Sequence, residues 1–204
     1  MKIKVIPLML LCFSSSSFAS SEIADNFSHI GFGYKGTTFK SGALKPYLNH
    51  EYNNRESKTM GGGYLDVSAQ VFDYVFVEGK ADFLTRFSSE LDSWQAGGGI
   101  LGRLGGRVAS SLSCGAVGYS ADSDYSSSYS ERGTYCKAML RKQVANHWLM
   151  GISYQHDFLD LARNEYKWGN IFQFGSVFGL VANLEYAERE KAEVSYELGV
   201  QFSF

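Results

Sequence analysis

The sequence is most informative, at first, through what it lacks. After residue 19 no apolar run is long enough for a transmembrane helix, which excludes a helical membrane protein. The formal net charge of −2 gives no basic footprint for nucleic acid. Prolines are scarce, with only Pro7 and Pro46 present. Metal-ligand spacings, phosphate-binding loops and nucleic-acid motifs are also missing, so we expect no cofactor, no metal and no nucleic-acid partner.

The first 19 residues have the pattern of a cleaved signal peptide. Lys2 and Lys4 precede an apolar run over residues 5–13, and small residues stand at the third-last and last positions before a cut after Ala19. The apolar run is too short to span a bilayer as a helix. We therefore expect residues 1–19 to be removed on export and residues 20–204 to form one domain.

The last thirteen residues, 192–204, alternate strictly between apolar and small or polar side chains. Successive side chains of a strand point to opposite faces, so this stretch predicts a strand with one apolar face and one polar face. It ends on an aromatic residue. The apolar face carries Val194, Tyr196, Leu198, Val200, Phe202 and Phe204.

The same period of two recurs along the chain, whereas helical spacing is scarce. Including the terminal strand, we expect ten strands, or eight if 94–104 is not a full strand or the segments after Gly169 form one long hairpin. The nine other segments are residues 29–35, 64–72, 75–87, 94–104, 107–119, 134–144, 148–158, 172–180 and 184–186.

The connections alternate between long and short. Short turns are expected near residues 73–74, 105–106, 145–146 and 181–182, and a tight charged turn at 188–191. Longer polar segments are expected at 40–59, 88–92, 121–133 and 160–167. Alternating link lengths are typical of an up-and-down antiparallel sheet with two different ends.

The apolar face of these strands could meet either a soluble core or lipid. Three features favour lipid. The opposite face is mostly glycine, serine or a mixture of acids and bases, which suits a narrow interior. The apolar face is rich in aromatic residues near strand ends, and several strands run 10–13 residues. The fold expected is therefore all-β, a closed antiparallel up-and-down transmembrane β-barrel, with a soluble barrel as the alternative. In the closed barrel the terminal strand is expected to pair with the strands around residues 30–34 and 184–186.

These features together resemble the small Gram-negative outer-membrane barrels, the OmpA/OmpX/Ail-like proteins of the porin-like superfamily, over essentially the whole mature chain. The resemblance implies an outer-membrane location, with outer-membrane lipid and lipopolysaccharide as surroundings. Tyr196, Phe202 and Phe204 match the positions of the C-terminal signal that the outer-membrane assembly machinery reads in that family. Ten strands would depart from the best-known members, which have eight.

Strand parity directs a set of charged side chains into the lumen. Buried charges must be paired, so these residues predict an internal ion-pair network that fills a narrow barrel. The alternative is a narrow pore for ions or small solutes, which interior size makes less favourable. The set is Glu78, Lys80, Asp82, Arg86, Lys137, Arg141, Asp157, Glu185 and Glu197.

An enzyme, such as an outer-membrane lipid hydrolase, is the less favoured function. It would need a nucleophile, a base and an orienting group that converge at one rim. No Ser–His spacing resembles the known barrel enzymes. His156 and Asp157 are strand neighbours and so point to opposite faces. We expect no catalytic residues and no enzymatic activity.

The long polar segments give the chain candidate recognition surfaces. Residues 121–133 are rich in Ser, Tyr and Asp, and residues 40–59 carry Tyr47, His50, Tyr52 and Arg55. Tyr with small polar residues suits adaptable binding surfaces, but exposed loops are polar whatever they do. An extracellular ligand of residues 40–59 and 121–133 is therefore one of two open interpretations.

Two cysteines follow the signal, Cys114 and Cys136, and an exported chain enters an oxidising compartment. If the third long segment is centred on Tyr125, the two cysteines lie directly opposite each other on antiparallel strands. Both share the parity of the apolar face. The register therefore predicts a disulfide between them on the lipid side.

Overall fold

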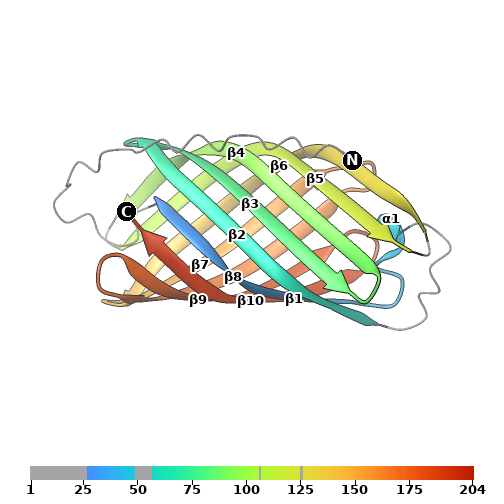
Figure 1. Cartoon of the computed structure of the whole chain (residues 1–204). Helices are drawn as coiled ribbons and strands as arrows, with labels where there is room; N and C mark the ends of the chain where they lie inside the picture. The colour runs from blue at the N-terminus through green and yellow to red at the C-terminus, as the bar shows by residue number, and fades with distance from the viewer. Residues whose placement is uncertain (1–26, 49–56, 106, 125) are drawn as a thin grey trace, which may run out of the picture.

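The structure, a computed structural model, describes residues 27–48, 57–105, 107–124 and 126–204. The predicted signal peptide, residues 1–19, lies outside the described residues. The described chain forms ten antiparallel strands and one short helix, α1 (Lys45–Leu48) (Figure 1). The strands are β1 (His29–Phe39), β2 (Lys58–Phe72), β3 (Val75–Arg86), β4 (Ser89–Gly105), β5 (Val108–Ser123), β6 (Ser126–Ala145), β7 (Trp148–Phe158), β8 (Arg163–Phe174), β9 (Phe178–Glu188) and β10 (Ala192–Ser203).

The ten strands close into one up-and-down barrel, which confirms the predicted fold class. Each strand pairs with its neighbours in sequence, and β10 closes the barrel against β1. The closing register runs from His29 opposite Ser203 to Phe39 opposite Glu193. On its other side β10 pairs with β9, so the terminal strand has the two partners that the sequence predicts.

The two ends of the barrel differ. The terminal end, which carries the start of β1 and the end of β10, has only short turns, while the loop end carries α1 and the long β1–β2 connection (Figure 1). Because the number of strands is even, the start of β1 and the end of β10 lie at the same end of the barrel. Within the described chain, no helix is long and apolar enough to cross a membrane.

The prediction of a loop at residues 121–133 is wrong. β5 runs to Ser123 and β6 begins at Ser126, so nearly the whole segment is paired strand. Burial keeps alternating there, with Tyr119, Ala121 and Ser123 inside and Ser120 outside. Composition suggested a loop because these residues are polar. Polar residues also suit a strand whose outer face meets water beyond a membrane, so composition does not separate the two.

Four other expected segments differ from the structure for related reasons. Residues 89–92 belong to β4 and residues 163–167 to β8, so these polar stretches are also strand. The expected strand at 172–180 is interrupted by the β8–β9 turn, and the expected turn at 181–182 lies within β9. Phe174 pairs with Phe178 across that turn, so the alternation continues through it and hides the break. Gly175, with φ of 79°, supplies the left-handed residue there.

The wall of the barrel is uneven in height. β4, β5 and β6 have 17, 16 and 20 residues, whereas β7 to β10 have 11 or 12. A tilted strand crosses a bilayer in about 9–11 residues. The β5–β6 hairpin therefore projects past the height at which the opposite wall ends.

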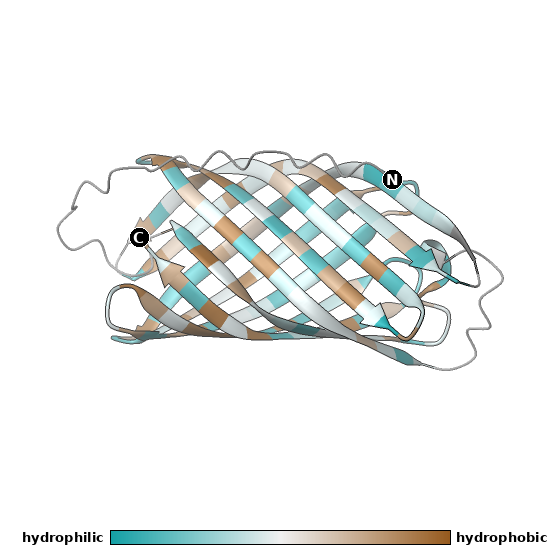
Figure 2. Ribbon diagram, in the orientation of Figure 1, coloured by the Kyte–Doolittle hydropathy of each residue, from teal (hydrophilic) through white to brown (hydrophobic). Residues whose placement is uncertain are grey.

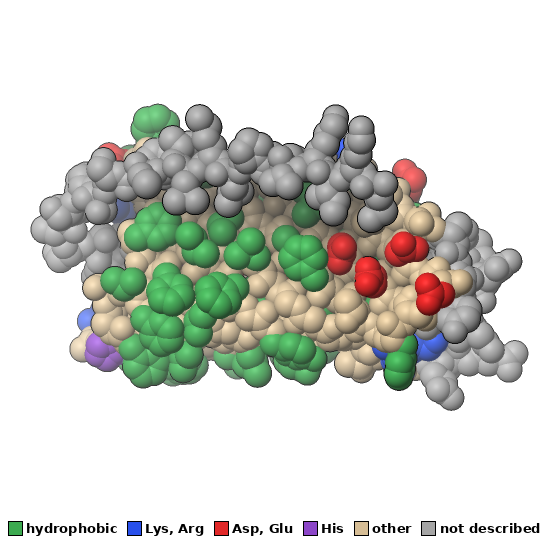
Figure 3. All heavy atoms as spheres, viewed as in Figure 1, with side chains coloured by type: hydrophobic (Ala, Val, Ile, Leu, Met, Phe, Trp, Pro, Cys, Tyr) green, Lys and Arg blue, Asp and Glu red, His purple; other side chains and the backbone are tan. Residues whose placement is uncertain are grey.

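The distribution of side chains is the reverse of that in a soluble protein. Many large apolar side chains are exposed on the outer face, while Asp157, Glu185 and Glu197 are at most 1% exposed. In Figure 2 apolar and polar residues alternate along the strands. Figure 3 shows hydrophobic side chains covering the visible wall toward the terminal end, with acidic residues gathered toward the loop end.

Aromatic side chains on the outer face lie in two bands. Nearer the terminal end, Phe202 contacts Phe32 and Phe178, with ring centroids 6.3 and 5.6 Å apart. Nearer the loop end, tyrosines of adjacent strands contact each other in the pairs Tyr34–Tyr196, Tyr154–Tyr166 and Tyr166–Tyr186. Such girdles mark the two interfaces of a membrane barrel.

Candidate functional site: the lumen

The lumen has three layers between its two ends. At the loop end lies an apolar cluster, here called the outer plug; in the middle lies a set of ion pairs, the charge network; toward the terminal end lies a cavity, the inner cavity. The outer plug consists of Phe39, Ala43, Leu44, Tyr47, Met60, Leu84, Leu91, Val117, Tyr119, Ala121 and Tyr135, all at most 8% exposed.

The chain after β1 folds back into the barrel to complete the outer plug. Gly42 takes a φ of 87°, which the left-handed region allows glycine at little cost, and α1 follows. Tyr47 of α1 is 1% exposed, and its ring packs against Phe39 and Tyr119. The sequence suggested that Tyr47 belongs to an exposed recognition loop. The structure places it in the buried outer plug instead. The neighbouring candidates His50, Tyr52 and Arg55 lie outside the described residues.

Charged groups brace the outer plug against the barrel wall. The Tyr47 hydroxyl donates to Glu193 Oε1 at 2.8 Å, and the Arg189 guanidinium lies 4.8 Å from the centre of the Tyr47 ring. Arg189 also pairs with Glu131 and donates to the Tyr129 hydroxyl. These contacts tie the β9–β10 turn to β6 across the mouth.

Burial sets the electrostatics of this mouth. It raises the pKa of Tyr47, and the Glu193 carboxylate raises it further, so the phenol stays protonated. Burial alone lowers the pKa of Arg189, but Tyr47, Tyr129 and Glu131 more than offset that effect and hold its pKa above the ordinary value. The loop-end mouth therefore contains the neutral phenol of Tyr47 beside the ion pair of Arg189 with Glu131.

The charge network joins three lysines to three carboxylates. Lys35 Nζ lies 2.6 Å from Glu185 and 2.8 Å from Asp82. Lys80 Nζ lies 2.6 Å from Glu197 and 2.9 Å from Glu185. The third base, from β8, completes the set: Lys167 Nζ lies 2.7 Å from Glu197 and 3.0 Å from Glu185.

This arrangement has equal numbers of acids and bases and lies inside the middle of the barrel. Glu185 and Glu197 contact all three lysines and are 1% and 0% exposed. Buried charges are tolerated when each is paired and hydrogen-bonded, as here. The strands that contribute are β1, β3, β8, β9 and β10, so the network also links distant parts of the wall.

The remaining residues expected in the lumen lie around this network. Glu78 pairs with Lys137 at 2.6 Å and also accepts from Tyr135 and Ser113. Asp157, fully buried, accepts from Tyr119 at 2.7 Å. Arg141 lies nearer the terminal end, where its guanidinium stacks 4.4 Å from the centre of the Phe27 ring.

Arg86 is the expected member that stands apart from the network. It lies at the loop-end rim, where it donates to the Thr59 carbonyl at 3.4 Å and stacks on Phe87. Its parity is that of the inner face, but β3 ends at this residue, so the side chain reaches the rim rather than the middle of the lumen.

Several charged lumen residues were not among the expected set. Lys35 was the last residue of its expected strand and had the inward parity, but it was not included in the set. Arg163, Glu165 and Lys167 were missed because their segment was expected to be a loop. In each case the signal was present, since all four continue the inward parity of their strands. The residues missed are Lys35, Asp66, Glu131, Arg163, Glu165, Lys167, Arg189 and Glu193.

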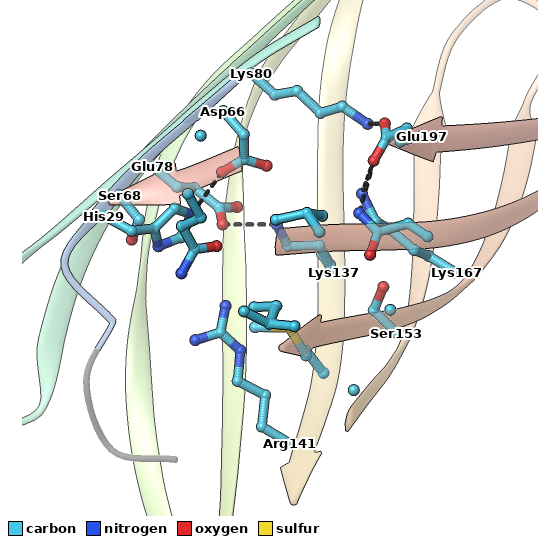
Figure 4. A pocket seen from close by; sticks show the side chains of 18 of the residues that line it. His29, Asp66, Ser68, Glu78, Lys80, Lys137, Arg141, Ser153, Lys167 and Glu197 are labelled. Carbon is cyan, nitrogen blue, oxygen red and sulfur yellow. Dashed lines mark hydrogen bonds and ion pairs between the residues drawn. The ribbon is translucent and has the colours of Figure 1, made fainter. Parts of the chain in front are cut away.

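The inner cavity occupies the lumen between the charge network and Phe27 (Figure 4). Its volume is about 120 Å³. The Asp66 carboxylate enters it from β2 and accepts from His29 Nε2 at 2.8 Å. Although Asp66 points into the barrel, its side chain is 35% exposed, because it borders open space.

A disulfide joins Cys114 of β5 to Cys136 of β6, with an S–S distance of 2.10 Å. The two residues are direct partners in the register and both lie on the outer face. The expected centre of the hairpin at Tyr125 gave the correct pairing, even though the hairpin around it is mostly strand.

The aromatic residues expected to form an assembly signal all point outward from β10 and its end. Tyr196, Phe202 and Phe204 are 43%, 41% and 62% exposed. They lie on one face of the closing strand, and Phe202 belongs to the terminal-end aromatic band.

The histidines within the described chain are not arranged as a hydrolase site. His156 lies on the outer face beside Phe158, while Asp157 lies inside, so the two do not cooperate. His29 contacts the Phe27 carbonyl through Nδ1 and Asp66 through Nε2, which engages both ring nitrogens. Among the described residues, no group of three or more His, Cys, Asp or Glu could hold a metal ion.

Comparison with known proteins extends the description of the fold. No protein-family model matches the sequence. No curated protein matches it significantly either. Among solved structures, an outer-membrane channel of Pseudomonas putida F1 superposes with a TM-score of 0.50 at 13% identity, covering 93% of this chain and all of that one.

Two further structures are similar at lower scores. The attachment invasion locus protein Ail of Yersinia pestis has a TM-score of 0.46 at 16% identity over 88% of this chain and 99% of that one. The β-domain of the Bordetella autotransporter BrkA has 0.47 at 11% identity over 88% of this chain and 100% of that one. Identities this low describe the fold alone. The chain therefore has the fold of the small outer-membrane β-barrels.

Proposed function

We propose that the protein is an integral barrel of the outer membrane whose lumen is closed, with a structural or surface-interaction role. The observation that carries this proposal is the outer plug. Tyr47, Phe39 and Tyr119 pack together at the mouth and are 1%, 2% and 8% exposed, so packed aromatic side chains stand where a pore would need water. The charge network beneath is proposed as a second barrier, because its ion pairs join side chains of five strands inside the lumen.

Insertion into a membrane is supported by the outer face. Isolated exposed apolar residues are normal, but a continuous apolar belt between two aromatic bands is not stable in water. Closure of the sheet pairs the strand edges, as lipid requires. Outer-membrane lipid and lipopolysaccharide are the proposed surroundings, and heat-modifiable gel mobility with outer-membrane fractionation tests this. A protein that fractionates as soluble would overturn it.

Conduction is the alternative, and planar-bilayer recording separates the two. We expect no steady conductance from the purified, folded protein. A steady channel that disappears when Arg141 and Glu78 are neutralised would instead establish a narrow pore. The matched control is Arg132→Gln, which removes a charge from the outer face at the loop end and leaves the lumen unchanged.

The surface role is supported by the uneven wall. The β5–β6 hairpin projects beyond the opposite wall and presents polar residues on its outer face, such as Ser120, Asp122 and Ser130. We propose this hairpin as the surface that meets an extracellular ligand, together with the long segment at residues 40–59 that the sequence suggests, from which burial in the outer plug excludes Tyr47. Shortening the hairpin by equal numbers of residues from both strands keeps the register; adhesion to host or matrix components that survives both this change and deletion of residues 49–56 would exclude these surfaces.

Two further parts of this proposal concern export and assembly. Residues 1–19 are proposed as a cleaved signal, which N-terminal sequencing of the mature protein would show as a start at Ser20 or Ser21. Tyr196, Phe202 and Phe204 are proposed as contacts for the assembly machinery; Phe204→Ala is expected to lower the yield of folded barrel. The protein is proposed to have no enzymatic activity, and hydrolysis of lipid or peptide by the purified barrel would reverse that.

A further inference from the structure

The inner cavity contains two buried hydroxyls that the chain itself does not satisfy. Tyr64 and Ser68 line it and are 5% and 7% exposed. Within the described part of the chain, neither Tyr64 Oη nor Ser68 Oγ has a hydrogen-bond partner. Buried polar groups are rarely left unpaired, because each loses its water without a replacement. The two hydroxyls therefore point to a polar occupant.

The charges around the cavity define which occupant fits. Its described lining has four acids (Asp66, Glu78, Glu165, Glu197) and four bases (Lys80, Lys137, Arg141, Lys167), which balance. Adding a single net charge to such an enclosed space would leave one charge without compensation. A molecule with both charges and no net charge keeps the balance.

The two signs are accessible on different walls of the cavity. The Asp66 carboxylate, on β2, is the most exposed acid and makes one hydrogen bond, from His29. Arg141 of β6 and Lys167 of β8 reach into the cavity from other walls, as Figure 4 shows. An ammonium group could thus approach Asp66 while a carboxylate faces the basic side.

Size limits the occupant further. A volume of about 120 Å³ is a little below that of an engineered cavity of ~150 Å³ that binds one benzene molecule. An amino acid with a very small side chain fills the same space. We propose that the inner cavity binds a small zwitterion of glycine size, with its ammonium at Asp66, its carboxylate toward Arg141 and Lys167, and the Tyr64 and Ser68 hydroxyls as further partners.

Such a molecule enters from the terminal end, because the charge network and outer plug block the other side. The terminal end is covered by Phe27, which is 2% exposed. Its ring packs 5.4 Å from the Phe76 ring and stacks with Arg141, and its carbonyl contacts His29 Nδ1 at 3.2 Å. Phe27 is therefore the side chain that must move aside.

A single-cysteine reporter tests both binding and entry. Ser153 lines the cavity, and in the full-length barrel Ser153→Cys provides a thiol there while the native disulfide stays intact. Its labelling by a small methanethiosulfonate reagent is expected to be slow, to become faster in the Phe27→Ala background, and to be slowed again by glycine. Acetate, methylammonium and glycerol at the same concentration are expected not to protect.

The outcomes separate the alternatives. Equal protection by acetate or methylammonium alone would mean an ordinary ion site, and protection by glycerol a polyol site; each overturns the zwitterion. Absence of labelling in both backgrounds, or absence of protection by glycine, overturns the site. Asp66→Asn is expected to raise the glycine concentration for half-protection about tenfold, the loss of one charge-assisted hydrogen bond. Asp73→Asn, in the exposed β2–β3 turn, is the matched control.

A second reporter keeps this inference separate from the proposed closed lumen. Ser195 lies on the loop-end side of the network, is 4% exposed and hydrogen-bonds to Thr37. Ser195→Cys is expected to resist labelling even with Phe27→Ala. Labelling there would show that the lumen is open throughout, which contradicts the proposed function, whereas the cavity is judged only by protection of Ser153→Cys.

Discussion

The two halves of the lumen solve the same problem in different ways. Both must fill the inside of a ten-stranded barrel. The loop-end half does so with a dry apolar core, including α1 folded in from the β1–β2 connection. The terminal-end half keeps an open space of about 120 Å³ among paired charges. The comparison teaches that packed apolar side chains can fill one half of a barrel while the other half keeps a cavity among charged side chains.

The largest expected effect comes from the charge network that separates the halves. Glu197→Ala leaves three buried lysines with only two carboxylates, so that Lys80 and Lys167 share Glu185 alone, and we expect a loss of about 3–5 kcal/mol in unfolding free energy. Urea titration of the folded barrel, followed by tryptophan fluorescence, measures it. Glu190→Ala in the exposed β9–β10 turn is the control and should change stability by less than about 0.5 kcal/mol. Similar small losses for both would mean that the network does not hold the barrel together.

The second prediction contrasts a residue of each half. Phe39→Ala removes a ring from the densely packed outer plug and is expected to cost about 3 kcal/mol or more. Met139→Ala, in the wall of the inner cavity, removes a half-buried side chain next to open space and should cost about 1 kcal/mol. The same urea titration compares them. Equal costs would show that the inner half is as tightly packed as the plug.

The third prediction uses two glycines on the inner face of β1. A Cβ at Gly33 would lie 2.2 Å from the Leu198 carbonyl oxygen and 2.5 Å from Gly199 Cα, so Gly33→Ala forces strands apart and should cost about 1–3 kcal/mol. A Cβ at Gly31 would lie 3.5 Å from the Val200 oxygen, which is ordinary contact. Gly31→Ala should therefore be neutral or stabilise by up to about 0.5 kcal/mol. If Gly31→Ala proves destabilising, the room for a Cβ that the structure gives beside Gly31 is contradicted.

The smallest expected effect is a pH dependence of the outer plug. Because the folded pKa of Tyr47 is raised, its contribution is complete below the unfolded pKa near 10 and is lost as pH rises above it. Each pH unit above 10 should cost up to about 1.4 kcal/mol. Stability measured from neutral to alkaline pH in the wild type and in Tyr47→Phe checks this. An unchanged alkaline slope in Tyr47→Phe would assign the loss to other tyrosines.

Much of the fold followed from alternation along the sequence. The terminal strand, its partners, the ten-strand count and the pairing of Cys114 with Cys136 all depend on a period of two, which a strand imposes whatever surrounds it. The errors occurred where the alternation continues unchanged across a turn and so does not mark the end of a strand. Phe172 and Phe178 keep the same parity across the β8–β9 turn, so the turn is invisible to the period.

The lumen was partly predictable for the same reason. Parity correctly directed Glu185 and Glu197 inward, but it could not say which base each would meet. Lys35 and Glu185 are 150 residues apart in sequence and 2.6 Å apart in space. Their contact depends on the curvature of the closed sheet and on strand register across the barrel.

The sequence by itself determined which side chains share a face of each strand, because alternate side chains must point to opposite faces. Strand length and the aromatic residues of the apolar face then favoured lipid outside and charges inside. Only the tertiary structure decided that α1 folds inward as part of the outer plug and that the inner cavity stays open. Those outcomes depend on how side chains from distant strands fill a closed space, and packing of that kind has no signature in the local order of residues.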